Sequence, residues 1–593
     1  MEKTVENLKE LIRAGRGLLP AEKVILHGTL VNVMSSEVYP ADVAIYKDTI
    51  VAIGEVNDYI GSNTQIIDAT GKYLVPGLID GHIHSECSKL SITSFAKAVV
   101  PCGTTSIISG LDEYISVSGI EGLKEIFKEI EKTPLNVFWG APYKTPYTIP
   151  ASTISCNFNP EIHREVQRWP ECFGVWETVR EAIQEEDEDA LGAIAEAAKN
   201  RLPVFGCAPM ARGKDLNGYL CAGVRLDHES YDHEEVVEKM RNGMHMLIRE
   251  SSVTHFLAEN IRAVTEVNPA LARRVSFCTD DVTPSDILAK GHLDNLVRLA
   301  IQAGVAPITA IQMATINSAE AYRIDDKVGS ISPGRNADIL LVNTLEEFQV
   351  EMVIANGQVV AKEKKLTYEL KAPIRSALLS SELKCKKTTE EDFKYKVAID
   401  DGMAKVLSMD VKGPFVRKRR DVLLKIKDGV VMPDIDQDVA MVSVLERFGK
   451  NGNKSLAFCS GWNLKKGAMA SSAAPDDNNL IVMGVNAKDM SVAVNYLIEN
   501  GGGQVLVADG AILAFLPLPV GGIASDEEPQ TIALKEKDLS DTARLLGCNM
   551  EEPLMYMFFL PITAIPDYAI TDVGPVDCVN LKIFNPILEL HEA

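Results

Sequence analysis

Positive charge is scarce in this sequence. Its 60 lysines and arginines are outnumbered by 83 aspartates and glutamates, which gives a formal net charge of -23. Nucleic acids and anionic membrane surfaces select for clustered lysine and arginine, so this balance argues against both as partners. The sequence contains neither a G-x-x-x-x-G-K-[ST] motif nor a dinucleotide fingerprint. It therefore does not indicate a binding site for a nucleoside triphosphate or for a dinucleotide.

Long hydrophobic runs and paired cysteines are missing as well. No apolar run is long enough to span a bilayer, and residues 1–8 lack the apolar centre of a signal peptide. The eleven cysteines are scattered without a CxxC pair, which indicates reduced thiols and predicts a cytoplasmic protein. With 46% hydrophobic and 24% charged residues, the composition is that of an ordinary globular protein.

The pattern of apolar residues predicts an α/β protein of five segments. A spacing near 3.6 predicts a helix within residues 1–21, and short β-branched runs predict a small sheet over residues 22–75. Between residues 76 and 327, short apolar runs alternate with helical stretches, which is typical of βα units. Short strands return over residues 328–372 and are expected to complete the first sheet, and a further α/β domain is predicted over residues 373–593.

Eight apolar runs in the middle segment predict eight parallel strands, the number that a closed (β/α)8 barrel needs. The first run starts at Val75 and leads to the tripeptide HIH at 82–84. The other seven runs cover residues 104–109, 136–140, 173–177, 202–207, 223–228, 245–250 and 275–280.

The first strand ends in two histidines, His82 and His84, spaced i, i+2. Alternate side chains on a strand share a face, so both imidazoles can bind one metal ion. Other metal-capable residues fall at or just after the ends of later strands, namely Glu177, Cys207, His228 and Asp280. Catalytic residues of (β/α)8 barrels gather at this carboxyl-terminal rim. The sequence therefore predicts a metal site at the rim.

These motifs resemble those of the amidohydrolase superfamily and, within it, of the adenine deaminases. The likeness extends over nearly the whole chain and includes PGLIDGHIH at 76–84, Glu177, DHE at 227–229, TDD at 279–281 and VGSISPGRNADILLV at 328–342. It implies a metal-bearing barrel, a β-sandwich built from both flanks of that barrel, and a C-terminal domain that covers the site. It also implies a homodimer or a higher homo-oligomer.

The chain departs from that family at positions where histidine is expected. Histidine is lost from five motifs, at Cys102, within GLDE at 110–113, at Cys207, at Phe448 and within PDDNN at 475–479. Three interpretations follow: an adenine deaminase with a rebuilt site, a hydrolase that opens a different small ring, or a catalytically silent binding protein. The retained metal-capable residues argue against the loss of metal.

The resemblance and the rim residues together give a hypothesis for the chemistry. The two histidines of the first strand would bind a divalent ion, and Asp280 would complete the site and take a proton from the attacking water. Glu177 would bridge to a second ion held by His228 and Cys207, whereas a single ion is expected if Cys207 only packs. Imidazole and carboxylate ligands suit Mn, Fe or Zn, and a thiolate favours Zn; Mn is the first expectation.

Such a site activates water for attack on an sp2 carbon. This chemistry serves the deamination of adenine, the opening of a cyclic amide, or the hydrolytic carbon–carbon cleavage of a cyclic 1,3-diketone. Glu86 and Glu113 are candidate catalytic acids, although each also fits a solvated or helix-capping carboxylate. The candidate substrate contacts are Asp112, Trp176, Arg447 and Asp476, and Trp176 alternatively fits a core position of the barrel.

Overall fold

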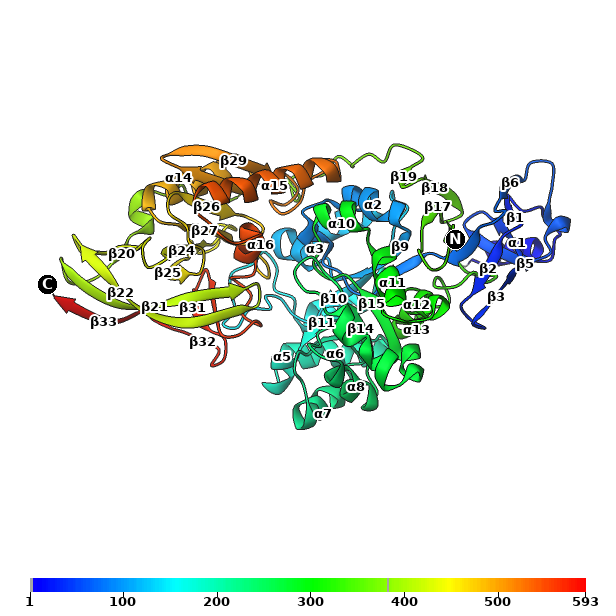
Figure 1. Ribbon diagram of the computed structural model, residues 1–593, viewed down its shortest axis with the longest axis horizontal. Coiled ribbons are helices and arrows are strands. Elements are labelled where there is room, and N and C mark those ends of the chain that lie inside the picture. Colours follow the sequence, from blue (N-terminus) through cyan, green and yellow to red (C-terminus); the bar gives the residue numbers. More distant parts are fainter. Residues whose placement is uncertain (1–3, 381–382, 593) are drawn as a thin grey trace.

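The computed structural model describes residues 4–380 and 383–592. Small N-terminal sheets lie at one end of the molecule, a barrel occupies the middle, and a C-terminal domain lies at the other end (Figure 1). Residues 1–3 of the predicted first segment and residues 381, 382 and 593 of the predicted last segment lie outside the described residues.

Two sheets flank the barrel on its N-terminal side. After helix α1 (Val5–Gly15), a four-stranded sheet has the order β5-β4-β1-β6 and consists of β1 (Lys23–Leu26), β4 (Asp42–Tyr46), β5 (Thr49–Gly54) and β6 (Gln65–Asp68). The second sheet has the order β19-β18-β17-β16-β7-β2-β3 and consists of β2 (Thr29–Asn32), β3 (Glu37–Pro40), β7 (Tyr73–Pro76), β16 (Ile339–Val342), β17 (Val350–Ala355), β18 (Gln358–Lys362) and β19 (Lys365–Leu366). Because β7 pairs with β16, chain from both sides of the barrel forms one sheet.

Eight parallel strands form the barrel, so the predicted α/β fold class is confirmed. In chain order they are β8 (Leu78–Asp80), β9 (Thr104–Ser109), β10 (Asn136–Pro142), β11 (Cys172–Val179), β12 (Val204–Cys207), β13 (Leu226–Asp227), β14 (His245–Arg249) and β15 (Val275–Cys278). The sheet closes where Gly81 N–H donates to Phe277 O at 3.0 Å and Asp280 N–H donates to His82 O at 3.0 Å. These two bonds join the end of the last strand to the end of the first.

Helices surround the barrel (Figure 1). They are α2 (Ile92–Val99), α3 (Asp112–Ile130), α4 (Pro160–Val166), α5 (Arg180–Gln184), α6 (Glu188–Asn200), α7 (Gly213–Cys221), α8 (His233–Arg241), α9 (Leu257–Asn260), α10 (Pro284–Lys290), α11 (Leu293–Gln302), α12 (Pro307–Met313) and α13 (Ile316–Tyr322). Acidic residues begin two of them: Asp187 accepts from Ala190 N–H at the start of α6, and Asp232 accepts from Glu235 N–H at the start of α8. Each cap satisfies an N–H group that has no partner inside the helix.

The C-terminal domain is built on an eleven-stranded sheet. Its strands are β20 (Tyr395–Lys396), β21 (Gly402–Gly413), β22 (Val416–Lys427), β23 (Val430–Val431), β24 (Val439–Leu445), β25 (Lys454–Ser460), β26 (Ala468–Ser471), β27 (Leu480–Gly484), β28 (Gly503–Ala508), β29 (Ala511–Pro517) and β33 (Ile587–Glu592). The remaining elements are α14 (Ala487–Glu499), α15 (Pro529–Leu545), α16 (Pro553–Phe558) and a small sheet of β30 (Tyr568–Thr571), β31 (Gly574–Asp577) and β32 (Lys582–Ile583). The glycine triplet at 501–503 turns the chain from α14 into β28.

Polar contacts and a shared apolar core join the C-terminal domain to the barrel. One continuous hydrophobic cluster runs from the barrel strands to β21, β25 and α16. Lys450 Nζ donates to Ile154 O at 2.6 Å, and Asn479 Nδ2 donates to Thr153 O at 2.9 Å. The C-terminal domain therefore covers the rim on which the predicted site lies. No helix among the described residues is long and apolar enough to cross a membrane.

Candidate metal centre

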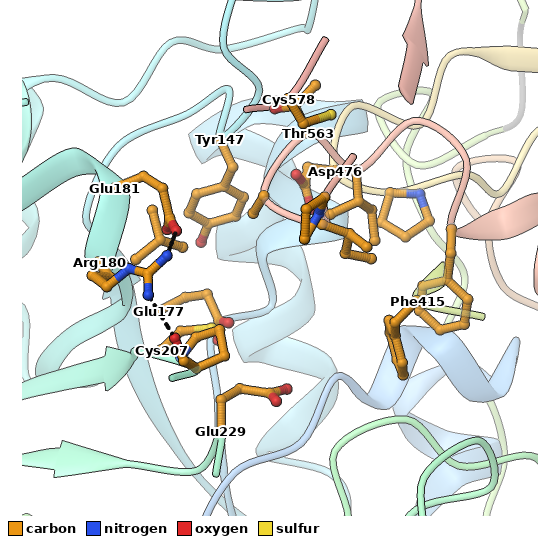
Figure 2. A pocket seen from close by; sticks show the side chains of 18 of the residues that line it. Tyr147, Glu177, Arg180, Glu181, Cys207, Glu229, Phe415, Asp476, Thr563 and Cys578 are labelled. Atoms are coloured by element: carbon orange, nitrogen blue, oxygen red, sulfur yellow. Dashed lines mark hydrogen bonds and ion pairs between the residues drawn. The ribbon is translucent and has the colours of Figure 1, made fainter. Parts of the chain in front are cut away.

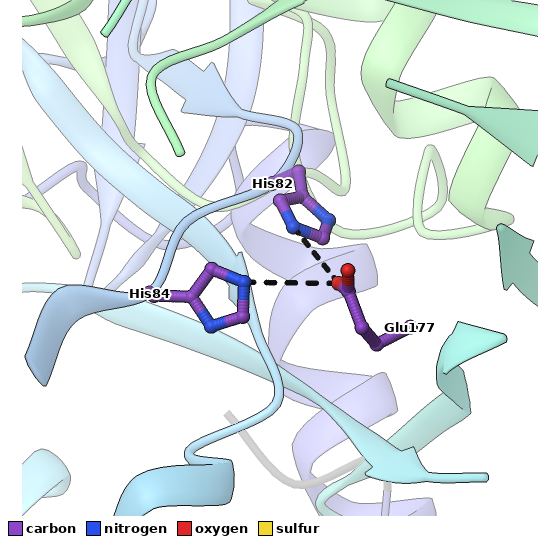
Figure 3. Close-up of side chains that lie close together, drawn as sticks. All are labelled: His82, His84 and Glu177. Carbon is purple, nitrogen blue, oxygen red and sulfur yellow. Dashed lines mark ion pairs between the residues drawn. The ribbon is translucent and has the colours of Figure 1, made fainter. Parts of the chain in front are cut away.

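Four of the predicted ligands converge at the carboxyl-terminal rim of the barrel. His82 and His84 follow β8, Glu177 lies in β11 and Asp280 follows β15. His82 Nε2 lies 3.1 Å from Glu177 Oε2 and 3.5 Å from Asp280 Oδ1. His84 Nε2 lies 3.7 Å from the same Glu177 oxygen and 3.6 Å from the same Asp280 oxygen. Figure 3 shows both imidazoles pointing at the Glu177 carboxylate.

These separations are at or slightly above those expected around a single divalent ion. Donors that bind one ion at about 2.1 Å lie roughly 3.0–3.4 Å apart in octahedral or tetrahedral geometry. His82 Nε2 and Glu177 Oε2 are buried, and neither atom makes a hydrogen bond. A buried polar atom without a partner costs free energy, which a bound cation would offset. The residues present therefore fit the metal that the sequence predicts.

Both candidate carboxylate ligands have an uncommon backbone conformation. Glu177 has φ 55° and Asp280 has φ 58°, in the left-handed region that residues with a side chain rarely adopt. Such conformations concentrate at functional sites, where the surrounding structure holds them in place. The turn at each residue lets its side chain point across the mouth of the barrel.

Burial keeps two of the histidines neutral. It lowers the pKa of His82 to about 3 and the pKa of His228 to about 4. A neutral imidazole has the free electron pair that a metal ligand needs. The His82 ring is clamped between Trp176, at a centroid distance of 4.1 Å, and His228, at 3.6 Å. This packing fixes the ring that carries Nε2.

A second, looser group lies beside the first. The ligand atoms of Glu177, Cys207 and His228 all lie within 4.8 Å of one another, and His228 Nε2 is 3.9 Å from Glu177 Oε1. His228 Nδ1 lies 3.1 Å from Gly206 O, so Nε2 is the nitrogen that faces the site. Burial and then the charge of Glu177 raise the pKa of the Cys207 thiol well above its usual range. Without a cation beside it the thiol therefore stays protonated, and binding of a metal through Cys207 would have to release that proton.

Arg249 is a site residue that the sequence reasoning missed. It ends β14, is 3% exposed, and forms ion pairs with both Glu229 and Asp280 Oδ2. Burial alone would raise the pKa of Asp280, but Arg249 and the neighbouring histidines lower it below the usual range. The signal was present in the sequence, because Arg249 stands at a strand end as the predicted ligands do.

The metal group lies in a cavity of about 460 Å³ between the two domains. Figure 2 shows Glu177, Cys207 and Glu229 on the barrel side, and Phe415, Asp476 and Thr563 on the side of the C-terminal domain. The barrel floor further contributes His84, Asp112, Glu113, Tyr147, Arg180, Glu181, His228, Arg249, Asp280 and Asp281. The roof consists mainly of apolar residues, namely Phe415, Phe558, Phe559, Ile562, Ala564, Ile565 and Pro566.

Three predicted carboxylates face this cavity beside the metal group. Asp112 Oδ1 lies 3.5 Å from His84 Nδ1, and Glu113 accepts a hydrogen bond from Asn478 Nδ2 of the C-terminal domain. Burial and then Asp112 raise the pKa of Glu113, and the same two causes raise the pKa of Asp476 to about 8. Carboxyl groups with such pKa values carry a proton near neutral pH and can donate it.

Three other predicted site residues do not line the cavity. Glu86 is buried and accepts from Ser85 Oγ at 3.0 Å. Trp176 is fully buried behind His82, which is the alternative that the sequence left open. Arg447 donates to the carbonyl oxygens of Ser472, Asn478 and Gly521 at 3.0, 3.2 and 2.8 Å. A guanidinium engaged in this way is not available to a substrate, so Arg447 is corrected to a residue that holds the segment around Asp476.

A closed barrel of eight parallel strands with histidines and carboxylates at its carboxyl-terminal rim defines a metal-dependent hydrolase. Comparisons with known proteins agree with this class. Residues 73–360 match the amidohydrolase family, and residues 415–582 match the adenine deaminase C-terminal domain. The chain is 74% identical to adenine deaminase 1 of Desulfotalea psychrophila over 100% of both chains.

Further relatives give the same result. Adenine deaminase 1 of Latilactobacillus sakei is 60% identical and adenine deaminase 4 of Rhizobium meliloti is 55% identical, each over 98% of both chains. The chain therefore belongs to the adenine deaminase family of the amidohydrolases, and the resemblance seen in its motifs is confirmed.

Proposed function

We propose that the protein hydrolyses a small cyclic substrate at an sp2 carbon. One divalent ion, for which Mn is the first candidate, would be held by His82, His84, Glu177 and Asp280. The observation that carries this proposal is that two histidine nitrogens each lie 3.1–3.7 Å from the same two carboxylate oxygens, at the floor of a cavity of about 460 Å³. The name of the relatives makes adenine the first candidate substrate, with hypoxanthine and ammonia as products.

A divalent ion, when bound, lowers the pKa of water and polarises the electrophile. The residues of the chain then move the protons. Asp280 Oδ1 faces the two histidines and accepts a proton from the attacking water, while Arg249 holds Oδ2 and fixes the direction of the carboxylate. Asp476, on the C-terminal side of the cavity, donates a proton to the leaving nitrogen, and Glu113, on the barrel floor, is the alternative donor. The oxygen of water ends on the ring carbon, one of its hydrogens joins the NH2 group that leaves as ammonia, and the other stays on the purine ring, so adenine and water give hypoxanthine and ammonia.

A second candidate is the opening of a non-purine ring, either a cyclic amide or a cyclic 1,3-diketone. The group of Asp112, Glu113 and Asp476 supports it, because protonated carboxyl groups donate hydrogen bonds to ring carbonyl oxygens. In the diketone, water would add to one carbonyl carbon and the carbon–carbon bond would break. The electron pair would leave as the enolate of the other carbonyl, and Asp476 would protonate its carbon to give a keto acid.

One experiment separates the two candidates. The purified protein is loaded separately with Mn, Fe and Zn and incubated with adenine, with dihydrouracil and with cyclohexane-1,3-dione. Release of ammonia and hypoxanthine at about 1 per second or faster, an ordinary enzymatic rate, would support deamination. Turnover of dihydrouracil or the diketone without turnover of adenine would assign the site to ring opening. Absence of turnover with all three, in protein that retains metal, would favour the silent binding protein.

Assembly and location remain predictions. A homodimer or a higher homo-oligomer is expected from the family likeness, and sedimentation of the metal-loaded protein measures it. A cytoplasmic location is expected from the scattered cysteines, and fractionation of the source cells tests it.

A further inference from the structure

A second pocket lies at the opposite end of the barrel from the metal group. Its volume is about 180 Å³, and its lining residues are Arg225, Leu226, His245, Arg273, Arg274, Asn317, Glu320 and Ala321. Three of these eight residues are arginines and one is an acid. This composition contrasts with a chain whose net charge is -23.

Neighbouring strands of the barrel build this pocket from their amino ends. Arg225 directly precedes β13, His245 is the first residue of β14, and Arg274 directly precedes β15. The three strands are adjacent in the order β15-β14-β13, with Leu226 paired to His245 and Met246 paired to Val275. Regular strand pairing therefore holds the basic side chains at one end of the barrel. Because β14 has five residues, Arg249 at its far end lies about 13 Å away, so the pocket is distinct from the metal group.

The three guanidinium groups of the pocket have no partner in the part of the chain that the structure describes. Within residues 4–380 and 383–592, none of Arg225, Arg273 and Arg274 forms an ion pair or a side-chain hydrogen bond. Two other exposed arginines of the barrel are paired with acids: Arg212 with Asp232 at 2.9 Å, and Arg262 with Glu259 at 2.9 Å. Acidic residues are abundant in this chain, so an unpaired group of arginines stands out.

Like charges gathered in one place repel one another. Burial and then the charges of Arg323 and Arg274 lower the pKa of Arg225. An anion seated between the guanidinium groups would remove this repulsion and supply the acceptors that they lack. A planar guanidinium group can donate two parallel hydrogen bonds to two oxygens of one phosphate group. A chloride ion does not offer two such oxygens.

We propose that this pocket at the amino ends of β13, β14 and β15 binds a phosphate-bearing anion, a phosphate monoester or free phosphate. Arg225 and Arg274 grip the phosphate oxygens from two sides, and Arg273 adds a third positive charge. The buried His245, whose Nε2 lies 2.8 Å from Ser276 Oγ, forms part of the pocket wall. The carboxylate of Glu320 faces the same space, where it can accept a hydrogen bond from a hydroxyl group of the ester.

Calorimetric titration of the full-length, metal-loaded protein tests this site. The probes are inorganic phosphate and glycerol 2-phosphate, titrated separately at constant ionic strength. We expect one saturable site per chain for at least one probe. The double variant Arg225→Gln and Arg274→Gln should weaken binding by about tenfold or more, because it removes two charge-assisted hydrogen-bonding groups. All of the substituted side chains are exposed, so the fold should be retained, and circular dichroism checks this.

Arg419→Gln is the matched control. Arg419 is an exposed arginine of the C-terminal domain, paired with Asp421 at 2.7 Å, and its loss should leave phosphate binding unchanged. Tighter binding of glycerol 2-phosphate than of phosphate would assign the site to a monoester, and the reverse order to free phosphate. Equal binding by wild type and double variant, or no saturable binding by wild type, would overturn the proposal. The proposal would also be overturned if wild type does not bind phosphate and the double variant changes its oligomeric state. That result would assign the arginines to a subunit interface.

Discussion

The floor and the roof of the large cavity are built in different ways. The floor belongs to the barrel and carries the charged residues, among them Glu177, Arg249 and Asp280. The roof belongs to the C-terminal domain and is mainly apolar, with Phe415 and the segment 558–566. The floor therefore offers the proposed metal ligands and most of the charged groups, whereas the roof offers one carboxyl group, Asp476, within an otherwise mainly apolar surface.

The supports behind the two surfaces differ as well. Behind the floor, the fully buried Lys239 Nζ donates to Asp227 Oδ2 and Glu235 Oε1, both at 2.6 Å, and to Ala208 O at 2.7 Å. Behind the roof, the buried Arg417 donates to the carbonyl oxygens of Phe559, Leu560, Ile562 and Ile565. One cation thus secures the loops that carry metal-capable residues, and the other secures the loop over the substrate. Substitutions in the floor and in the roof should therefore have different effects. Changes in the floor should act mainly on the chemical step, and changes in the roof should act mainly on substrate binding.

Asp280→Asn should have the largest effect, because it acts on the floor itself. The change removes a metal ligand and the group that accepts the proton, so we expect kcat to fall about 10²- to 10⁴-fold. Metal per chain, measured by mass spectrometry, should fall as well. Asp286→Asn is the control, since Asp286 lies on α10 of the same barrel and pairs with Lys290 at 2.8 Å. Full activity of the Asp280 variant would remove Asp280 from the proposed machinery.

Lys239→Met should have the next largest effect, on stability. It leaves the carboxylates of Asp227 and Glu235 buried without their cation, so the free energy of unfolding should fall by about 3–5 kcal/mol. Urea unfolding followed by circular dichroism measures this loss. Lys199→Met, which removes a side chain that is 70% exposed and paired with Glu196 at 2.9 Å, should cost at most about 1 kcal/mol. Equal losses in the two variants would contradict a supporting role for Lys239.

Arg417→Met should change the fit of the substrate more than the chemistry. Several carbonyl groups of the roof segment lose their donor, so the segment should loosen and KM should rise about tenfold, which corresponds to about 1.4 kcal/mol. The value of kcat should change less, because no floor residue is touched. Steady-state kinetics of Arg417→Met and of the exposed control Arg419→Met measure the separate changes in KM and kcat. An equal fall in kcat with unchanged KM would mean that the roof takes part in the chemical step.

Cys207→Ala should have the smallest effect. The thiol belongs to the looser group, so we expect metal per chain to stay the same and activity to change by less than about tenfold, below the roughly 10- to 100-fold that loss of an outer-shell partner costs. Metal analysis of wild type and variant, loaded in parallel, is the measurement. A fall from two ions to one per chain would instead establish a second metal held by the thiolate.

Strand-end reasoning found the floor because parallel strands of a barrel finish at one rim. His82, Glu177 and Asp280 are far apart in the chain, but each follows an apolar run, and this was sufficient to place them together. Arg249 obeys the same rule, but arginine is not a metal ligand, so its place at a strand end did not mark it as part of a metal site. Asp476 lies on a loop whose position depends on the docking of the C-terminal domain, and only the family likeness pointed to it.

The sequence by itself determined the fold class and the family and predicted the residues of the metal group, because apolar periodicity and strand-end motifs are local properties of the chain. Only the tertiary structure decided which polar side chains face the cavity. Glu113 and Asp476 face it, whereas Glu86 and Arg447 do not, since these directions depend on how the two domains pack. The arginine pocket has the same origin: Arg225 and Arg274 are 49 positions apart in sequence number and meet only because β13, β14 and β15 are neighbours.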